Sequence, residues 1–225
     1  VPAATLTSAS SDASFRRYFR WQDGERSLIV MDAPPPQENC APFVNIAALL
    51  AEAGLNVPQI LAADLEHGFL LLNDLGRQTY LDVITAENAD PLFSDALQAL
   101  LALQQLPLDR GLPSYDEALL RRELQLFPDW YLDKHKGAVL DDKERHTLLL
   151  AFDQIVKVNL AAPQVFVHRD FMPRNLMMPF QNEQLGVLDF QDAVYGPISY
   201  DIASLMRDAF LTWDEDFVLD ITIRY

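Results

Sequence analysis

The chain has 225 residues, half of them apolar and 22% charged, which is the composition of a globular protein with a sizeable core. Its net charge of −16 argues against non-specific binding to nucleic acid or to an anionic membrane surface. The single cysteine excludes an intrachain disulfide and favours a reducing, cytoplasmic location, and the four scattered histidines argue against a zinc site.

We expect neither a membrane span nor a secretory signal. No apolar run approaches the roughly 18 residues of a transmembrane helix. The first five residues lack the basic start and apolar core of a signal peptide. The missing initiator methionine indicates that the natural start was removed or lies upstream.

The N-terminal third predicts a small antiparallel sheet. Residues 5–14 are small and polar and predict a turn, followed by strands over residues 15–21 and 28–32. Small residues let backbone N–H groups approach a phosphate, and serine hydroxyls can donate to it. Ser11 and Ser14 are therefore candidate nucleotide-binding residues, although a serine-rich turn is more often only a turn.

A helix is expected over residues 42–53, and a second strand pair over residues 59–64 and 68–73. The last strand ends in Asn73-Asp74-Leu75-Gly76, which predicts a hinge whose backbone an adenine can bind. Asn73 and Asp74 are candidate nucleotide-binding residues. We expect two lobes, a sheet lobe over residues 1–75 and a mainly helical lobe over residues 76–225.

The pattern after the hinge is helical. Apolar spacing predicts helices over residues 80–84, 90–106, 114–134, 141–160, 200–211 and 214–225. Ser114 and Ser199 are expected caps, and Pro128 is expected to kink or split its helix. Trp130 and Tyr131 can stack on a sugar ring, but aromatic residues at helical spacing more often belong to a core.

The stretch from Val165 to Asp192 carries the chemistry. A short apolar run ends in His168-Arg169-Asp170, Asn175 follows after four intervening residues, and a later apolar run ends in Asp189. This spacing matches the kinase catalytic loop H-R-D-x-x-x-x-N followed by an Asp-Phe metal motif. Any one of these residues alone is more often a turn residue, but the whole constellation favours catalysis.

Phosphoryl transfer explains these residue types. Divalent metal neutralises the polyphosphate and requires hard oxygen ligands, which Asn175 and Asp189 can supply. Asp170 is expected to orient the acceptor hydroxyl and take its proton late. The segment 191–197 predicts a loop with a turn, and Asp201 either satisfies a helix dipole or braces the catalytic loop.

These motifs, together with Gly196-Pro197 and Asp201, resemble the aminoglycoside phosphotransferase family of kinase-like small-molecule kinases. The resemblance implies an α+β, bilobal protein-kinase-like fold that uses ATP and Mg²⁺. Longer strings narrow the resemblance to the branch that phosphorylates the anomeric (C1) hydroxyl of N-acetylmuramate and N-acetylglucosamine, namely residues 11–20, 30–35 and 188–197. Family members usually continue with more helices, which indicates that this chain is a fragment or lacks its end.

The sequence departs from the general kinase pattern at the phosphate-pairing lysine. Met31 occupies its position in Leu28-Ile29-Val30-Met31, and the first lysine of the chain is Lys134. Metal alone or an arginine must replace it, and the candidates are Arg16, Arg17 and Arg20. Gln191 also replaces the glycine of Asp-Phe-Gly, which argues against a flipping activation segment.

By analogy with the family, the acceptor lies between the catalytic loop and the helices of the larger lobe. The candidate substrate-binding residues are Arg174, Asp192, Arg207 and Trp130. The favoured function is a sugar 1-kinase. The alternatives are an aminoglycoside or amino-alcohol kinase, which the acidic chain would suit, and a nucleotide-binding pseudokinase, which the missing lysine would suit.

Overall fold

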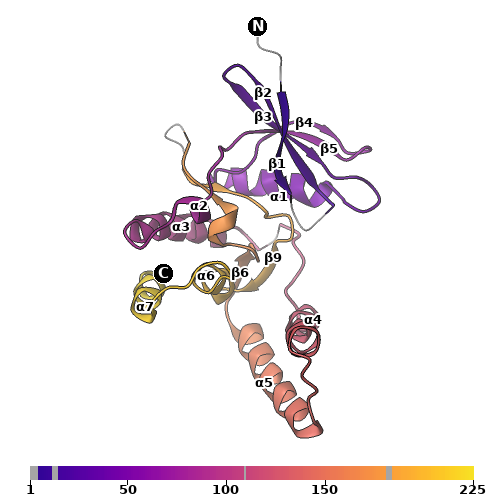
Figure 1. The fold of residues 1–225 in the computed structure, drawn as a ribbon, viewed down its shortest axis with the longest axis vertical. Coiled ribbons are helices and arrows are strands. Elements are labelled where there is room, and N and C mark those ends of the chain that lie inside the picture. Colours follow the sequence, from indigo (N-terminus) through magenta and orange to yellow (C-terminus); the bar gives the residue numbers. More distant parts are fainter. Residues whose placement is uncertain (1–4, 12–14, 109, 181–183) are drawn as a thin grey trace. The chain divides into compact units, whose positions relative to one another are not determined.

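The computed structural model describes residues 5–11, 15–108, 110–180 and 184–225. Five antiparallel strands form one sheet in the order β1-β2-β3-β5-β4 (Figure 1). Their bounds are β1 (Thr5–Ser11), β2 (Arg17–Asp23), β3 (Arg26–Asp32), β4 (Ile60–Asp64) and β5 (Phe69–Asn73). The sheet and both predicted strand pairs are confirmed, with ends shifted by one or two residues.

The prediction of a turn over residues 5–14 is wrong for its first part, because residues 5–11 form β1. This strand pairs with β2 from Thr5↔Gln22 to Ser11↔Arg17, with an irregularity between Ser8 and Ser10. Pairing with a neighbouring strand thus overrides the turn preference of small polar residues. Residues 12–14 lie outside the described residues.

Met31 lies on β3, the middle strand of the sheet, one residue before the strand ends. Met31 lies opposite Tyr18 on β2 and Leu70 on β5, and directly opposed side chains share a face. Met31 is fully buried. Helix α1 (Ala41–Glu52) confirms the predicted helix after the proline segment, and its buried residue Phe43 packs 4.9 Å from Phe190, ring centre to ring centre.

The contacts group the chain into two compact units. Unit 1 comprises Val1–Leu103, His168–Asp192 and Asp201–Tyr225. It contains the sheet and α1. Its other elements include α2 (Tyr80–Val83), α3 (Ala89–Gln104), β7 (Leu176–Met177), β8 (Gly186–Val187), α6 (Ser199–Met206) and α7 (Glu215–Arg224). Phe93 of α3 packs edge-to-face on Trp213 and on Phe217, at 5.5 Å between ring centres in each pair.

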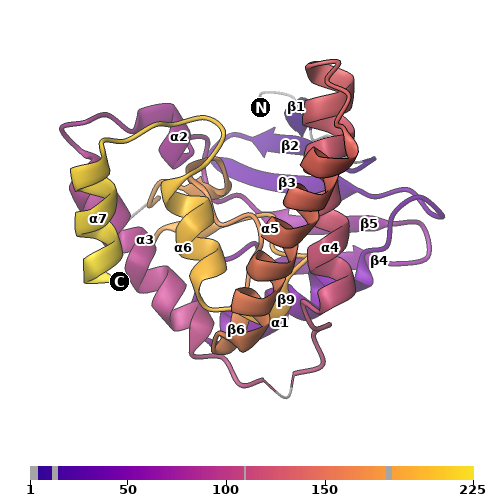
Figure 2. The same ribbon diagram turned by 90° about the horizontal axis from the view of Figure 1, so that it is seen from below.

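Unit 2 comprises Gln104–Val167 and Ala193–Tyr200. It contains α4 (Glu117–Leu126), the π-helix η1 (Phe127–His135), α5 (Asp142–Ala161), β6 (Gln164–Val167) and β9 (Val194–Pro197) (Figure 2). Strands β6 and β9 pair in antiparallel fashion. Its buried core is formed by Tyr115, Leu120, Val156, Val167 and Val194.

Several element boundaries differ from the predictions. Asp116, and not Ser114, caps α4, and the helix changes type at residue 127, next to Pro128 as expected. Residues 194–197 form a strand rather than a loop, because β6 offers them a pairing edge. Helix α6 ends at Met206 instead of Leu211, since the Asp208 carboxylate accepts hydrogen bonds from the backbone N–H groups of Phe210 and Leu211.

Across the described ranges, we find no helix with both the length and the apolar character needed to cross a bilayer. The division into lobes at residues 75 and 76 stays a prediction.

Candidate active site

A buried carboxylate holds the start of the catalytic loop. Asp201 accepts hydrogen bonds from the backbone N–H groups of His168 (2.7 Å) and Arg169 (3.0 Å), which confirms the bracing role. Burial raises the pKa of Asp201 to about 7, against the two backbone hydrogen bonds that lower it. The next residue in the loop is Asp170, which is half-buried.

The two predicted metal ligands lie together. Asn175 sits in the 3-10 turn η2 (Pro173–Asn175), just before β7, and Asp189 follows β8. The Asn175 amide donates to the Asp170 carbonyl (2.8 Å) and lies 3.4 Å from Asp189 Oδ2. The Leu188 N–H donates to the Asn175 carbonyl, at 2.9 Å. The short β7–β8 pair thus brings all three parts of the motif to one place.

This oxygen set fits a magnesium ion. Because Asn175 uses its amide nitrogen as the donor to Asp170 and Asp189, its Oδ1 atom is the oxygen that it can offer to a metal ion. No group of three or more His, Cys, Asp or Glu side chains suitable for a metal occurs among the described residues. Mg²⁺ suits this arrangement, since one or two protein ligands usually hold it together with substrate phosphates and water.

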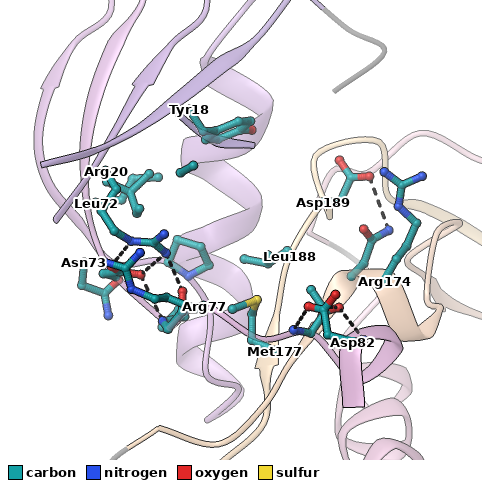
Figure 3. Close-up of a pocket in the computed structure, with 18 of the residues that line it drawn as sticks. Tyr18, Arg20, Leu72, Asn73, Arg77, Asp82, Arg174, Met177, Leu188 and Asp189 are labelled. Carbon is teal, nitrogen blue, oxygen red and sulfur yellow. Dashed lines mark hydrogen bonds and ion pairs between the residues drawn. The ribbon is translucent and has the colours of Figure 1, made fainter. Parts of the chain in front are cut away.

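A pocket of about 340 Å³ opens beside this pair (Figure 3). The sheet contributes Tyr18, Arg20, Ile29 and Leu72, and the hinge contributes Asn73 and Asp74. The opposite wall includes Arg174, Asn175, Leu188 and Asp189, as Figure 3 shows for the labelled residues. The volume lies in the usual range for small-ligand sites. The predicted hinge and metal pair therefore line one cavity of unit 1.

Two of the predicted nucleotide-binding residues bind each other. Arg20 donates to the Asp74 carboxylate through Nε (2.6 Å) and Nη2 (3.0 Å), and also to the Gly76 carbonyl at 2.6 Å. Ser27 and the Gly76 N–H donate to the same carboxylate. The Asn73 side-chain oxygen accepts from the Gln59 N–H, at 2.7 Å. These side chains fix the hinge to strands β2 and β3.

The other candidates at this end lie outside the pocket lining. Arg16 pairs with Glu38 (3.0 Å), and Arg17 pairs with Asp32 on the sheet face opposite to Arg20. Ser11 ends β1, and its side chain is not among those described. Ser14 lies outside the described residues.

Among the predicted substrate-binding residues, only Arg174 lines the pocket as far as the described residues go. Asp192 is exposed, and its carbonyl accepts from Arg169 at 3.3 Å. Arg207 is exposed and pairs with Glu215 at 2.7 Å. Trp130 belongs to unit 2 and is 66% exposed. Their proposed roles remain predictions.

Sequence reasoning missed two contributors to the site. Gln191 is buried and donates from Nε2 to Asp189 Oδ1 at 2.8 Å, so it orients the carboxylate. Its position two residues after Asp189 was a usable signal. Phe210 stacks on the Arg174 guanidinium, with the Cζ atom 5.3 Å from the ring centre. No sequence pattern links these two residues, because they lie 36 positions apart.

Residues 5–225 match the model of a family described as phosphotransferase enzyme family. The chain is 60% identical over 225 residues to the N-acetylmuramate/N-acetylglucosamine kinase of Pseudomonas aeruginosa; this match covers 100% of the chain and 66% of that protein. The protein of the same name from Neisseria meningitidis is 46% identical over 226 residues, covering 98% of this chain and 66% of that protein. The chain thus spans slightly less than two thirds of both relatives.

Two solved structures share the fold. The GDP complex of aminoglycoside 2'-phosphotransferase-IIIa has a TM-score of 0.69 at 19% identity, covering 97% of this chain and 76% of that one. Aminoglycoside-3'-phosphotransferase of type VIII has a TM-score of 0.65 at 18% identity, covering 100% and 86%. These likenesses confirm the predicted α+β, protein-kinase-like fold class.

Proposed function

Because the chain belongs to the phosphotransferase enzyme family, we propose that it acts as an ATP- and Mg²⁺-dependent kinase of amino sugars. Membership confirms the resemblance drawn from the motifs. The proposed acceptors are N-acetylmuramate and N-acetylglucosamine, phosphorylated at the anomeric (C1) hydroxyl. The names of relatives up to 60% identical support this choice. The single observation that carries the kinase activity is the clustering of Asp170, Asn175 and Asp189 beside the pocket.

The geometry supports a division of labour within this cluster. Asp170 would orient the sugar hydroxyl and accept its proton late in the transfer. The anomeric hydroxyl is more acidic than other sugar hydroxyls, because the ring oxygen withdraws charge, so a carboxylate is an adequate base. Bound Mg²⁺ would neutralise the phosphates. Asn175 and Asp189 would hold the ion, with Asp189 oriented by Gln191.

The rest of the pocket suits a nucleotide. Ile29, Leu72 and Leu188 provide apolar contact for an adenine, and the hinge backbone at residues 73–76 offers its hydrogen-bonding groups. The hinge is held by the Arg20–Asp74 pair. We also propose the lobe division at residues 75 and 76 and, on the single cysteine, a cytoplasmic location.

A coupled assay for ADP release tests the proposal. The acceptors are N-acetylmuramate, N-acetylglucosamine, glucose and kanamycin, each at the same concentration with Mg-ATP. The proposal expects turnover with both N-acetyl sugars and little with the other two. Turnover with kanamycin alone would move the protein to an antibiotic-modifying function. Nucleotide binding without turnover on any acceptor would favour the pseudokinase, for which the buried Met31 is the supporting observation.

A further inference from the structure

Strand β3 presents no positive charge to the nucleotide pocket. The position of the kinase lysine is occupied by Met31, which is fully buried between Tyr18 and Leu70 on its sheet face. Transfer of a terminal phosphoryl group concentrates negative charge on that group, so a cation near it is expected. The overall charge of −16 makes a local cation more important.

Three arginines line the pocket, and two of them already serve the hinge region. Arg20 uses Nε and Nη2 on the Asp74 carboxylate and the Gly76 carbonyl. Arg77 donates from Nη2 to Gln22 Oε1, at 2.9 Å. Both therefore lie at the end of the pocket where the hinge would hold the base, away from the residues that would hold metal and phosphate.

Arg174 is the third of these arginines, and it lies next to the metal pair. It directly precedes Asn175, whose amide contacts Asp189, and Figure 3 shows its side chain beside Asp189 at the far side of the pocket from Arg20. Within the described part of the chain, no carboxylate forms an ion pair with Arg174. Its guanidinium instead lies over the Phe210 ring.

We propose that Arg174 binds the terminal phosphate of the nucleotide and supplies the charge that β3 lacks, with Phe210 positioning it. This inference rests on the proposed kinase function. A ring against one guanidinium face holds its plane, while the N–H groups at the edge stay available to donate. Arginine matches phosphate oxygens in this way by paired hydrogen bonds. Arg174 would thus approach the phosphate from the catalytic loop rather than from the sheet.

Calorimetric titration of Mg-ATP and Mg-ADP without acceptor tests the inference. A charge-assisted contact predicts a rise of roughly tenfold or more in the ATP Kd of Arg174→Gln. The ADP Kd should change less than about threefold, because ADP lacks the terminal phosphate. The ATP Kd of Arg174→Lys should lie between those of wild type and Arg174→Gln. Phe210→Leu should also raise the ATP Kd more than the ADP Kd, but by less than Arg174→Gln does. Arg121→Gln, an exposed arginine of α4, is the matched control and should change neither affinity.

The outcomes separate this inference from the function on which it rests. A wild-type protein that binds no Mg-nucleotide would overturn the proposed kinase. If the wild-type protein binds both nucleotides and Arg174→Gln binds each of them with the wild-type affinity, only the role of Arg174 would be overturned. If Arg174→Gln kept both nucleotide affinities but had a raised KM for the acceptor sugar, Arg174 would bind the sugar instead of the phosphate. This result would also overturn the inference.

Discussion

At the scale of single residues, one residue of the catalytic loop and one of the metal motif have backbone conformations that residues other than glycine rarely adopt. Arg169 has a φ angle of 77° and Asp189 one of 64°. Such left-handed residues carry a cost of about 1–3 kcal/mol each and persist where the surroundings fix them. Here Asp201 holds the Arg169 N–H, and Gln191 holds the Asp189 carboxylate. The strain falls on the proposed metal ligand Asp189 and on the residue next to the proposed base Asp170.

Asp170→Asn should separate chemistry from binding. If Asp170 accepts the acceptor proton, kcat should fall by about 10²- to 10⁴-fold. The Mg-ATP affinity should stay within about threefold of wild type, because the metal pair is untouched. Steady-state kinetics and calorimetry measure the two quantities. Asp64→Asn, at the exposed last residue of β4, should leave both unchanged. An Asp170→Asn variant with wild-type kcat would remove the base assignment.

The buried His168 should lower the free energy of unfolding at acidic pH. Burial lowers the pKa of His168 from 6.5 to about 4. Between these two pH values the unfolded chain therefore binds a proton at His168 and the folded chain does not. Its contribution is present above pH 6.5 and is lost as the pH falls toward 4. Between pH 7 and pH 5 the stability difference between wild type and His168→Asn should shrink by about 2 kcal/mol in urea unfolding.

Asp201 should act in the opposite direction, which provides a control for this sign. Its pKa is raised from 3.8 to about 7, so its stabilising contribution is greatest at low pH and is lost as the pH rises through 7. The deficit of Asp201→Asn relative to wild type should therefore grow from pH 7 to pH 5. If the deficits of both variants shrank from pH 7 to pH 5, the assignment of Asp201 would be contradicted; if both grew, the assignment of His168 would be contradicted.

At the scale of elements, pattern and spacing predicted most strands and helices, because their apolar periods are strong. The strand β1 was missed since its residues are small and polar and only the register with β2 makes them a strand. The strand β9 was missed because it needs the edge of β6, which lies 27 residues earlier in the chain. The change from α-helix to the π-helix η1 leaves no trace in the apolar periodicity of the sequence. Pro128 indicated only that the helix would be kinked or split there.

The link between β3 and β5 gives an element-scale prediction. The Ala33 N–H donates to the Gly68 carbonyl at 2.8 Å, and a Cβ atom at Gly68 would overlap the Ala33 carbonyl oxygen. Gly68→Ala should therefore lower the free energy of unfolding by at least about 3 kcal/mol in urea. Gly24→Ala shares a positive φ but has open space around it, so it should cost about 1 kcal/mol. Equal costs would contradict the steric cause.

At the scale of the whole molecule, the motifs predicted the candidate residues of the site but not how their neighbours hold them. Asp170, Asn175 and Asp189 were recognisable from spacing alone. The pairing of Arg20 with Asp74 was not, because it joins residues 54 positions apart. The pair supports the hinge, and the nucleotide contacts expected of both residues stay a prediction. Distant contacts of this kind depend on the fold and leave no local pattern.

Transfer to the anomeric hydroxyl is tested by phosphorus NMR of the product formed from Mg-ATP and N-acetylglucosamine labelled with ¹³C at C1. We expect a new phosphomonoester signal whose phosphorus is coupled to the labelled carbon, and no product from the methyl glycoside, whose C1 oxygen is blocked. A phosphomonoester without that coupling, or phosphorylation of the methyl glycoside, would contradict transfer to the anomeric hydroxyl.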